Sequence, residues 1–166
     1  MNFYTSDHHF NHKNIIKYCN RIFLSVEEMN YFMIQRWNEV VSKDDTVYHL
    51  GDFSFSSTVE DIALFVKKLN GKIILIRGNH DRKSRASFLR AGFSEMYKKT
   101  AMIKDGRTNV ILSHKPLDVW EGKGDGFIHL HGHCHGNEIP FIRDRYDVGV
   151  DCWNYYPMSL EKIISK

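Results

Sequence analysis

Apolar residues recur along the first half of the chain with two spacings, one typical of strands and one typical of helices. Apolar, β-prone runs predict strands at residues 2–6, 46–50 and 72–77. Helical spacing predicts helices at residues 14–19, 26–42, 57–71 and 84–91. Two of these helices begin with a capping pair, Ser25 with Glu28 and Ser57 with Glu60. The alternation of strand and helix favours β-α-β units with parallel strand pairing.

The second half of the chain is strand-rich. The expected strands are residues 96–104, 109–114, 127–132 and 146–151. Asp105-Gly106 is a turn signal between the first two, and the pattern favours antiparallel pairing. The whole chain is therefore expected to be α/β, with one mixed sheet or two packed sheets flanked by helices. At 166 residues, one domain over residues 1–166 can bury most of its unfolded apolar surface.

The composition is that of an ordinary soluble protein. Hydrophobic residues make up 42% and charged residues 26%, and no apolar run reaches the roughly 18 residues of a membrane span. No signal peptide is visible and the three cysteines lack C-x-x-C spacing, so we expect a cytoplasmic protein. The net charge of +3 tolerates an anionic substrate without demanding nucleic acid. Nothing in the pattern favours one oligomeric state over another.

Polar side chains follow five of the predicted strands. Residues 128–136 read IHLHGHCHG, and alternate side chains of an extended strand point to one face. The polar residues at the five strand ends are Asp7 with His9, Asp52, Asn79 with His80 and Asp81, His114, and His133 with His135. The carboxyl ends of strands are where open α/β sheets collect their ligand-binding loops. Five remote segments are therefore expected to converge on one site.

The candidate ligand set contains three oxygen donors and four imidazoles: Asp7, His9, Asp52, Asn79, His114, His133 and His135. This is too many for one ion and suits two, which lie about 3.5–4 Å apart in two-metal hydrolytic sites. Positions i and i+2 of a strand lie about 6.5–7 Å apart, so His133 and His135 could reach different ions while Cys134 faces away. The absence of cysteine from the set favours Mn²⁺ or Fe, with Zn²⁺ and Ni²⁺ as alternatives, over a closed structural zinc site.

Read in chain order, the motifs are D-x-H at Asp7, G-D at Gly51, G-N-H-D at Gly78, His114, and G-H-x-H at Gly132. This series resembles the signature of the calcineurin-like metallophosphoesterase superfamily, and residues 146–163 resemble the end of its small, single-domain bacterial and phage members. The resemblance implies a four-layer αββα sandwich of two mixed β-sheets flanked by helices. It also implies a ligand assignment: Asp7, His9 and His135 on one ion, Asn79, His114 and His133 on the other, and Asp52 bridging the two.

The resemblance further implies a metal-dependent phosphoester hydrolase. A hydroxide held between the ions would attack phosphorus in line, while protonated His80 would donate to the leaving oxygen, a task that suits imidazole. Asp81 would either orient His80 or hold its loop. An open site without a lid favours a phosphodiesterase that acts on a nucleotide or a nucleic-acid end. A phosphomonoesterase and a non-catalytic phosphate-binding module are the alternatives.

One motif departs from the superfamily's protein phosphatases. They have G-D-x-x-D-R-G where this chain reads GDFSFSS at residues 51–57, so the phosphate-gripping arginine is missing and a phosphoprotein phosphatase is disfavoured. The candidates for contacting substrate phosphate instead are Arg82, Arg21, Lys115 and His12, each with solvated surface or local packing as its alternative. Four further histidines are expected to be packed or hydrogen-bonded rather than ligating: His8, His49, His129 and His131, the last as a possible support behind a ligand.

Overall fold

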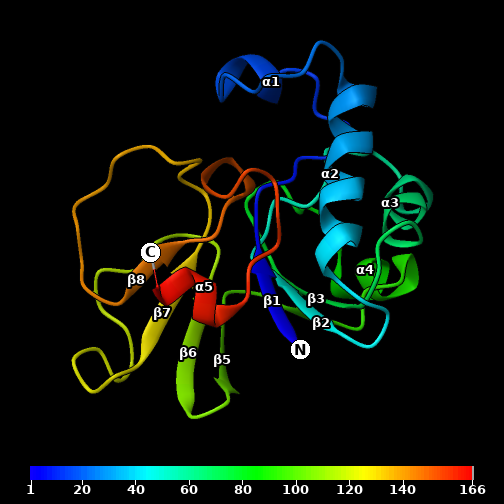
Figure 1. The fold of residues 1–166 in the computed structure, drawn as a ribbon. Helices are drawn as coiled ribbons and strands as arrows, with labels where there is room; N and C mark the ends of the chain where they lie inside the picture. The colour runs from blue at the N-terminus through cyan, green and yellow to red at the C-terminus, as the bar shows by residue number, and fades with distance from the viewer. Residues whose placement is uncertain (166) are drawn as a thin grey trace.

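The first sheet is built from the strands of the β-α-β pattern, and these strands run in one direction (Figure 1). The computed structural model describes residues 1–165. The strands of the first sheet lie side by side in sequence order: β1 (Asn2–Thr5), β2 (Thr46–His49), β3 (Lys72–Ile76) and β4 (Glu95–Tyr97). Side chains alternate between the two faces, so Phe3 packs on the helical side and Tyr4 on the other. The parallel pairing expected of the first half is confirmed.

Helices occupy the connections within this sheet: α1 (Ile15–Tyr18), α2 (Val26–Val40), α3 (Val59–Val66) and α4 (Arg85–Ala91). Figure 1 shows α2, α3 and α4 on the face that is turned away from the second sheet. The Ser25 hydroxyl caps α2 by accepting a hydrogen bond from the backbone N–H of Glu28 at 3.1 Å. The predicted cap of α3 is wrong by one residue, because Thr58 rather than Ser57 accepts from the N–H of Asp61.

The second sheet is mixed. It contains β5 (Thr100–Asp105), β6 (Thr108–Ser113), β7 (Ile128–His131) and β8 (Arg145–Asp147), in that order. The strands β5 and β6 pair antiparallel across Gly106, as expected, but β6, β7 and β8 pair parallel. The expectation of antiparallel pairing is therefore wrong for β7 and β8. The loops 114–127 and 132–144 are long enough to return the chain to the start of the next parallel strand.

Two predicted strands are divided in the structure. Residues 96–104 break at Lys98 and Lys99, where the chain leaves β4 of the first sheet and enters β5 of the second. Residues 146–151 end as a strand at Asp147 and continue into a short 3₁₀ helix, η1 (Val150–Cys152). A last helix, α5 (Leu160–Ile164), lies in the tail, where no helix was expected.

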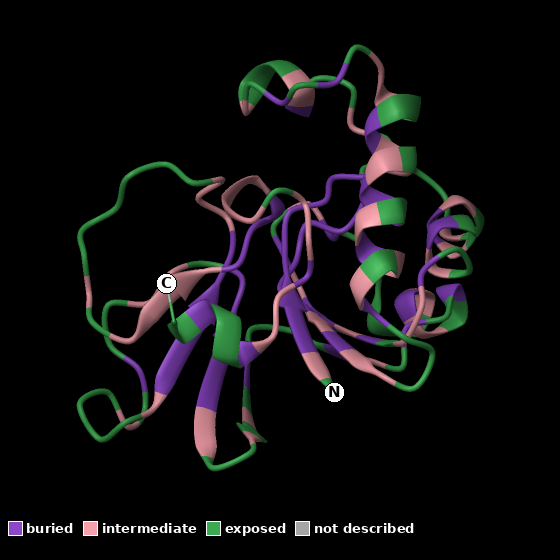
Figure 2. Cartoon of the chain, in the orientation of Figure 1, coloured by how far each residue is buried: buried purple, intermediate pink, exposed green. Residues whose placement is uncertain are grey.

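The two sheets enclose an apolar core to which both contribute: Tyr4, Leu50, Ile76, Val110, Leu112 and Leu130. Helix α5 adds Leu160 and Ile163 to it. On the outer face of the second sheet, the loop 114–127 packs its buried Trp120 against His129, with ring centroids 5.2 Å apart. Figure 2 shows that burial continues from the strands into the loops at their carboxyl ends. Because loops usually lie at the surface, this burial marks the edge where the polar candidates gather.

The expected α/β fold of two sheets flanked by helices is thus confirmed. The aromatic residues of the tail belong to its packing, since Tyr155 contacts Phe23 at 5.1 Å and Trp153 packs on the core between the sheets. Within residues 1–165, no helix combines the length and the apolar character that a bilayer span requires.

Candidate metal centre

Sharp turns of the backbone aim the candidate ligands. A positive φ in the left-handed region is uncommon for a residue other than glycine and costs roughly 1–3 kcal/mol at functional sites. Five of the seven candidates have it: Asp7 (61°), His9 (51°), Asp52 (55°), His133 (72°) and His135 (52°). Such a turn directly after a strand brings polar side chains back over the edge of the sheet. The concentration of strain at these residues is typical of a functional site.

The first cluster consists of Asp7, His9 and His135, whose ligand atoms lie within 4.8 Å of one another. The Nε2 atom of His135 is 4.0 Å from Asp7 Oδ1. In the described chain, Asp7 Oδ1 and His9 Nε2 are buried without a hydrogen-bond partner. Burial raises the pKa of Asp7 to about 8. Buried polar atoms normally have partners, so two orphaned atoms facing one space fit a cation that both would coordinate.

The second cluster consists of Asp52, His114 and His133, again with ligand atoms within 4.8 Å of one another. The His114 Nδ1–H donates to the carbonyl oxygen of Leu50 at 2.8 Å, which leaves Nε2 with its lone pair. That Nε2 faces Asn79 Oδ1 at 2.8 Å and His133 Nδ1 at 3.2 Å. With Nδ1 of His114 donating to Leu50, His114 Nε2 and Asn79 Oδ1 are both acceptors, and two acceptors that face one another fit a shared cation.

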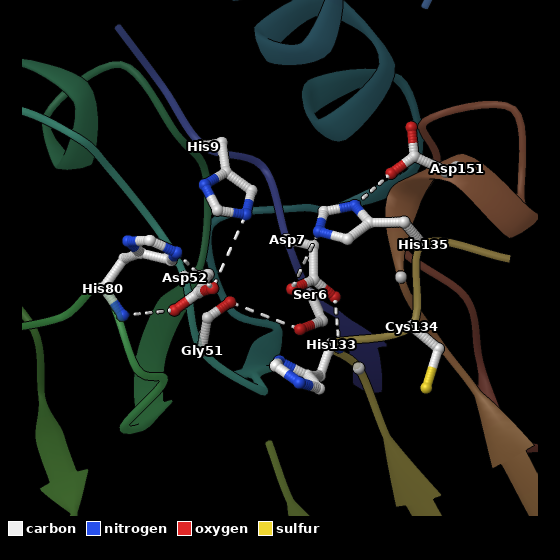
Figure 3. Close-up of polar contacts among 12 residues, drawn as sticks. Ser6, Asp7, His9, Gly51, Asp52, His80, His133, Cys134, His135 and Asp151 are labelled. Carbon is white, nitrogen blue, oxygen red and sulfur yellow. Dashed lines mark hydrogen bonds and ion pairs between the residues drawn. The ribbon is translucent and has the colours of Figure 1, made fainter. Parts of the chain in front are cut away.

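Asp52 belongs to the second cluster and also approaches His9 of the first, whose ring lies above its carboxylate in Figure 3. Its Oδ2 is 3.5 Å from His9 Nε2 on one side and 3.5 Å from His114 Nε2 on the other. Its Oδ1 accepts a hydrogen bond from the backbone N–H of His80 at 2.8 Å. Gly78 makes room for this arrangement, because a Cβ there would lie 2.2 Å from Asp52 Oδ1. One carboxylate oxygen is therefore available to both clusters.

Both sheets contribute to each cluster. In the first, Asp7 follows β1 of the first sheet and His135 follows β7 of the second. In the second, Asp52 follows β2 of the first sheet and His114 follows β6 of the second. The seven predicted ligands thus come together at one edge, where the carboxyl ends of the strands of both sheets meet.

His80 borders the second cluster, and Asp81 lies beneath it. The imidazole of His80 is 31% exposed, with Nε2 4.0 Å from Asp52 Oδ2. The Asp81 carboxylate accepts hydrogen bonds from the backbone N–H groups of Asp52 (2.8 Å), Phe53 (3.1 Å) and Gly78 (2.8 Å). These contacts match the loop-holding alternative for Asp81 rather than the orientation of the His80 ring.

The prediction that Arg21 contacts substrate is wrong. Its side chain is fully buried, and Nε and Nη2 donate to the Asp151 carboxylate at 2.8 and 2.9 Å. The guanidinium also donates to the carbonyl oxygens of Asp7 (2.7 Å) and His8 (3.0 Å). Its donors are therefore committed within the protein and cannot reach a phosphate outside.

Asp151 is a site residue that the sequence analysis did not identify. Its Oδ2 accepts a hydrogen bond from His135 Nδ1–H at 2.8 Å, which turns Nε2 of that ring toward Asp7. Burial opposes the charged imidazole, but the hydrogen bonds to Asp151 and Cys19 and the charge of Asp7 together outweigh it and raise the pKa of His135 to about 10. The sequence did contain a signal for Asp151, because it is a carboxylate at the end of the predicted strand YDVGVD, like the other candidates at strand ends.

Of the other substrate candidates, His12 and Arg82 lie around His80. The ring of His12 stacks on Phe55 with centroids 4.0 Å apart and is 6.3 Å from the His80 ring. Arg82 is exposed and lines a cavity of about 250 Å³ together with Phe55, His80 and Lys83. Phe55, which is 48% exposed, was not identified from the sequence. The available signal was an aromatic residue among the serines of GDFSFSS, but its exposure became known only from the structure. Lys115 is exposed beside His114.

The remaining histidines are held away from the centre. His8 Nδ1 lies 2.9 Å from His49 Nε2 in the core, and burial lowers the pKa of both rings. His129 Nε2 accepts from the Leu117 N–H at 3.0 Å. His131 Nδ1–H donates to the carbonyl oxygen of Gly132 at 2.9 Å rather than supporting a ligand side chain.

The comparison with protein families agrees with this geometry. A family model described as calcineurin-like phosphoesterase matches residues 3–162. The chain belongs to the calcineurin-like phosphoesterase family. Membership implies a phosphoester substrate and divalent metal ions, for which the two clusters supply suitable donors. The superfamily resemblance of the sequence is thereby confirmed.

Relatives of this phosphoesterase occur in archaea and phages. An uncharacterized protein of Methanocaldococcus jannaschii is 42% identical over 166 residues, which cover 96% of this chain and 86% of that protein. The gene 66 protein of Mycobacterium phage L5 is 34% identical over 182 residues, covering 90% of this chain and 86% of that one.

Solved structures show the same fold. A protein of unknown function from Aquifex aeolicus, AQ665, superimposes with a TM-score of 0.80 at 25% identity, covering 99% of this chain and 98% of that one. A novel archaeal phosphodiesterase has a TM-score of 0.54 at 18% identity, covering 89% and 81% of the two chains, and shares the fold.

Proposed function

We propose that this phosphoesterase is a phosphodiesterase that acts on a nucleotide or a nucleic-acid end, with two divalent ions and with His80 as proton donor. The position of Asp52 is the observation on which the proposal rests. One of its oxygens lies 3.5 Å from an imidazole of each cluster, and the other accepts from the backbone N–H of His80. The Asp52 carboxylate thus contacts a histidine of each cluster and the backbone of His80, the candidate acid.

The donor chemistry supports two ions. Asp7, His9 and His135 would hold one and Asn79, His114 and His133 the other, with Asp52 shared. Imidazole, carboxylate and amide donors without a thiolate suit Mn²⁺ or Fe, with Zn²⁺ and Ni²⁺ as alternatives. When bound, such ions lower the pKa of water and neutralise charge on phosphoryl oxygens.

The protein's own groups supply the proton transfer. The imidazole of His80 is 31% exposed at the mouth of the site and 4.0 Å from the Asp52 carboxylate. Asp81 fixes the loop under it through backbone hydrogen bonds. A nucleoside alkoxide is a poor leaving group, so an imidazolium at this position would donate a proton to the departing oxygen. This supports His80 as the general acid.

Aromatic and basic residues next to His80 support a nucleotide substrate. A leaving group protonated by His80 departs toward Phe55, whose ring centroid is 5.3 Å from that of His80. Stacking of a nucleobase on an aromatic ring contributes about 1–3 kcal/mol. Arg82 and Lys83 line the same cavity and could pair with a neighbouring phosphate. The site therefore offers both a stacking surface and cations on the leaving-group side.

The activity test compares a diester with a monoester. Metal-depleted protein is reloaded with Mn²⁺ and assayed with bis-p-nitrophenyl phosphate and with p-nitrophenyl phosphate. We expect preferential turnover of the diester. Preference for the monoester would favour a phosphomonoesterase, and no turnover of either compound would favour a phosphate-binding module.

The substrate class is tested at Phe55. Phe55→Leu keeps an apolar side chain but cannot stack, and it should raise KM for a dinucleotide about 5- to 150-fold, the equivalent of 1–3 kcal/mol of stacking. Phe55→Tyr is the matched control and should restore the original KM. An unchanged KM in Phe55→Leu would remove the stacking surface from the proposal.

A further inference from the structure

Cys134 lies between two candidate ion ligands, yet its side chain points away from them (Figure 3). On that opposite side it meets two other residues. A ligand atom from each of His131, Cys134 and Asp147 lies within 4.8 Å of the others. These residues are distinct from the seven candidates of the two-ion centre, and the proposed phosphodiesterase activity does not account for their grouping.

The sheet itself holds two of these residues together. His131 and Asp147 are register partners on the parallel strands β7 and β8. Partner residues of adjacent strands present their side chains on the same face. Cys134 follows three residues after His131, where the chain turns at His133 with a φ of 72°. The juxtaposition therefore follows from backbone pairing and not from a chance meeting of flexible side chains.

His131 and Asp147 each have one polar atom anchored by a hydrogen bond and a second atom that could coordinate an ion. The His131 Nδ1–H donates to the Gly132 carbonyl oxygen at 2.9 Å, which leaves Nε2 with its lone pair. Asp147 Oδ1 accepts from the Gly149 N–H at 2.7 Å. Asp147 Oδ2 is buried and, within residues 1–165, has no hydrogen-bond partner. An orphaned, buried carboxylate oxygen is costly unless something satisfies it.

A purely structural role for the three residues fits their contacts less well. A structural pair would join the imidazole to the carboxylate, but no hydrogen bond or ion pair between His131 and Asp147 occurs in the described chain. The neighbouring cation Arg145 is committed elsewhere, since its Nη1 donates to Asp118 Oδ1 at 2.9 Å and to the Leu117 carbonyl oxygen at 3.2 Å. One carboxylate oxygen of Asp147 nevertheless lies within 4.8 Å of the Cys134 sulfur and of a ring nitrogen of His131.

We propose that His131, Cys134 and Asp147 form a third metal site, for a zinc-type divalent ion. One nitrogen, one sulfur and one oxygen donor are a ligand set for Zn²⁺, whose fourth position a water would complete. Thiolate is the form of cysteine that binds metal, so an ion bound here would displace the proton of the Cys134 thiol.

A metal ion at this site would fix the loop that carries the other centre. Cys134 is flanked by His133 and His135, which belong to different clusters of the two-ion centre. An ion bound to the Cys134 sulfur would hold the intervening backbone from behind. The third site thus has a positioning role for the ligands on either side of it.

Cobalt substitution tests the site without any enzyme assay. Thiolate ligation to Co²⁺ produces a charge-transfer band in the near ultraviolet, which imidazole and carboxylate ligands do not produce. Metal-depleted protein is titrated with Co²⁺, and we expect the band in the natural chain. Because the two-ion centre contains no cysteine, the band reports on sulfur ligation elsewhere. Absence of the band in the natural chain would overturn the proposal.

Variants of the cysteines assign the sulfur ligand. Cys134→Ser should abolish the band, whereas Cys19→Ser and Cys152→Ser should retain it. Cys19 is a demanding control, because it lies with His135 and Asp151 in another cluster of potential ligands. A band that persists in Cys134→Ser and disappears in Cys19→Ser would place the thiolate at Cys19 and overturn the assignment.

A carboxylate variant covers the case in which Cys134→Ser fails to fold. Asp147→Asn keeps the shape of the side chain and an oxygen for the Gly149 N–H. Loss of a ligand should weaken the titration of the band by more than about tenfold, because even partners behind a ligand contribute 10–100-fold. Circular dichroism verifies the fold. An unchanged Co²⁺ midpoint in folded Asp147→Asn would remove Asp147 from the site and overturn the proposal.

Discussion

Replacing Arg21 by methionine separates a structural arginine from a substrate-binding one. The Arg21 side chain is fully buried, and that of its partner Asp151 is 9% exposed. Methionine keeps the apolar stem but removes the charge and the donors to the Asp7 and His8 carbonyl oxygens. We expect loss of stability and weaker metal binding, with little direct effect on the substrate.

The magnitude follows from the burial of the pair. Removing one partner of a buried ion pair destabilises a protein by about 3–5 kcal/mol. Because His135 still donates to Asp151 in the variant, the lower end, about 3 kcal/mol, is appropriate. For a chain of this size, 3 kcal/mol corresponds to a fall in Tm of about 6–12 °C. Metal affinity should fall about 10–100-fold, because Asp151 is no longer held behind His135.

The assay uses urea unfolding in the presence of a chelator, so that metal binding does not mask the change. Arg82→Met is the matched control, since Arg82 is exposed beside His80. Its free energy of unfolding should stay within about 0.5 kcal/mol of the natural value, while its KM rises. If Arg21→Met instead kept its stability and only raised KM at saturating metal, the structural role of Arg21 would be refuted.

Further predictions concern the acid, the protons of the first cluster and a glycine. His80→Asn should lower kcat by about 10²–10⁴ while the protein still binds its full complement of Mn²⁺, measured by elemental analysis. In chelator, stability should fall as pH rises through about 8 and then about 10, because the raised pKa values of Asp7 and His135 favour their protonated forms in the folded chain. Metal affinity should rise over the same pH range, because the ligands must lose their protons to bind an ion. Competition titrations at several pH values measure this affinity, and an affinity that does not change with pH would contradict the prediction. Gly132→Ala, whose Cβ would lie 2.0 Å from Ser6 Oγ and 2.4 Å from Asp7 Oδ2, should bind metal more weakly than Gly106→Ala, which meets no atom within 4 Å.

The parts of the molecule that local pattern controls were predictable. The strands that precede Asp7, Asp52 and His114 are visible in the sequence because polar residues follow each strand-forming run, and parallel packing then brings such ends to one edge. Cys134 was expected to face away from its histidine neighbours because side chains alternate along extended backbone. It does face away, but β7 ends at His131 and His133 and His135 have left-handed backbone, so a turn rather than an extended strand separates the side chains.

The parts of the molecule that depend on tertiary packing could not be predicted from the sequence. The sequence around Arg21 does not reveal that Asp151, 130 positions later, takes up its charge inside the protein. The run 96–104 satisfies a strand pattern throughout, and only the partners available to each half decide that it serves two different sheets. The direction of β7 and β8 likewise depends on how the long loops cross the sheet, which strand propensity does not contain.

The mixed origin of each cluster has a mechanical consequence. Since every ion would draw donors from both sheets, the pair would add a further link between two halves of the molecule that already meet through apolar contacts and through hydrogen bonds such as that from His114 Nδ1–H to the Leu50 carbonyl oxygen. Bound ions would act as a reversible cross-link between the sheets, which forms or breaks with the metal concentration. Removal of metal would then weaken the packing between the two sheets, first at the edge that carries the candidate ligands. The ions proposed for catalysis would therefore also stabilise the association of the two sheets.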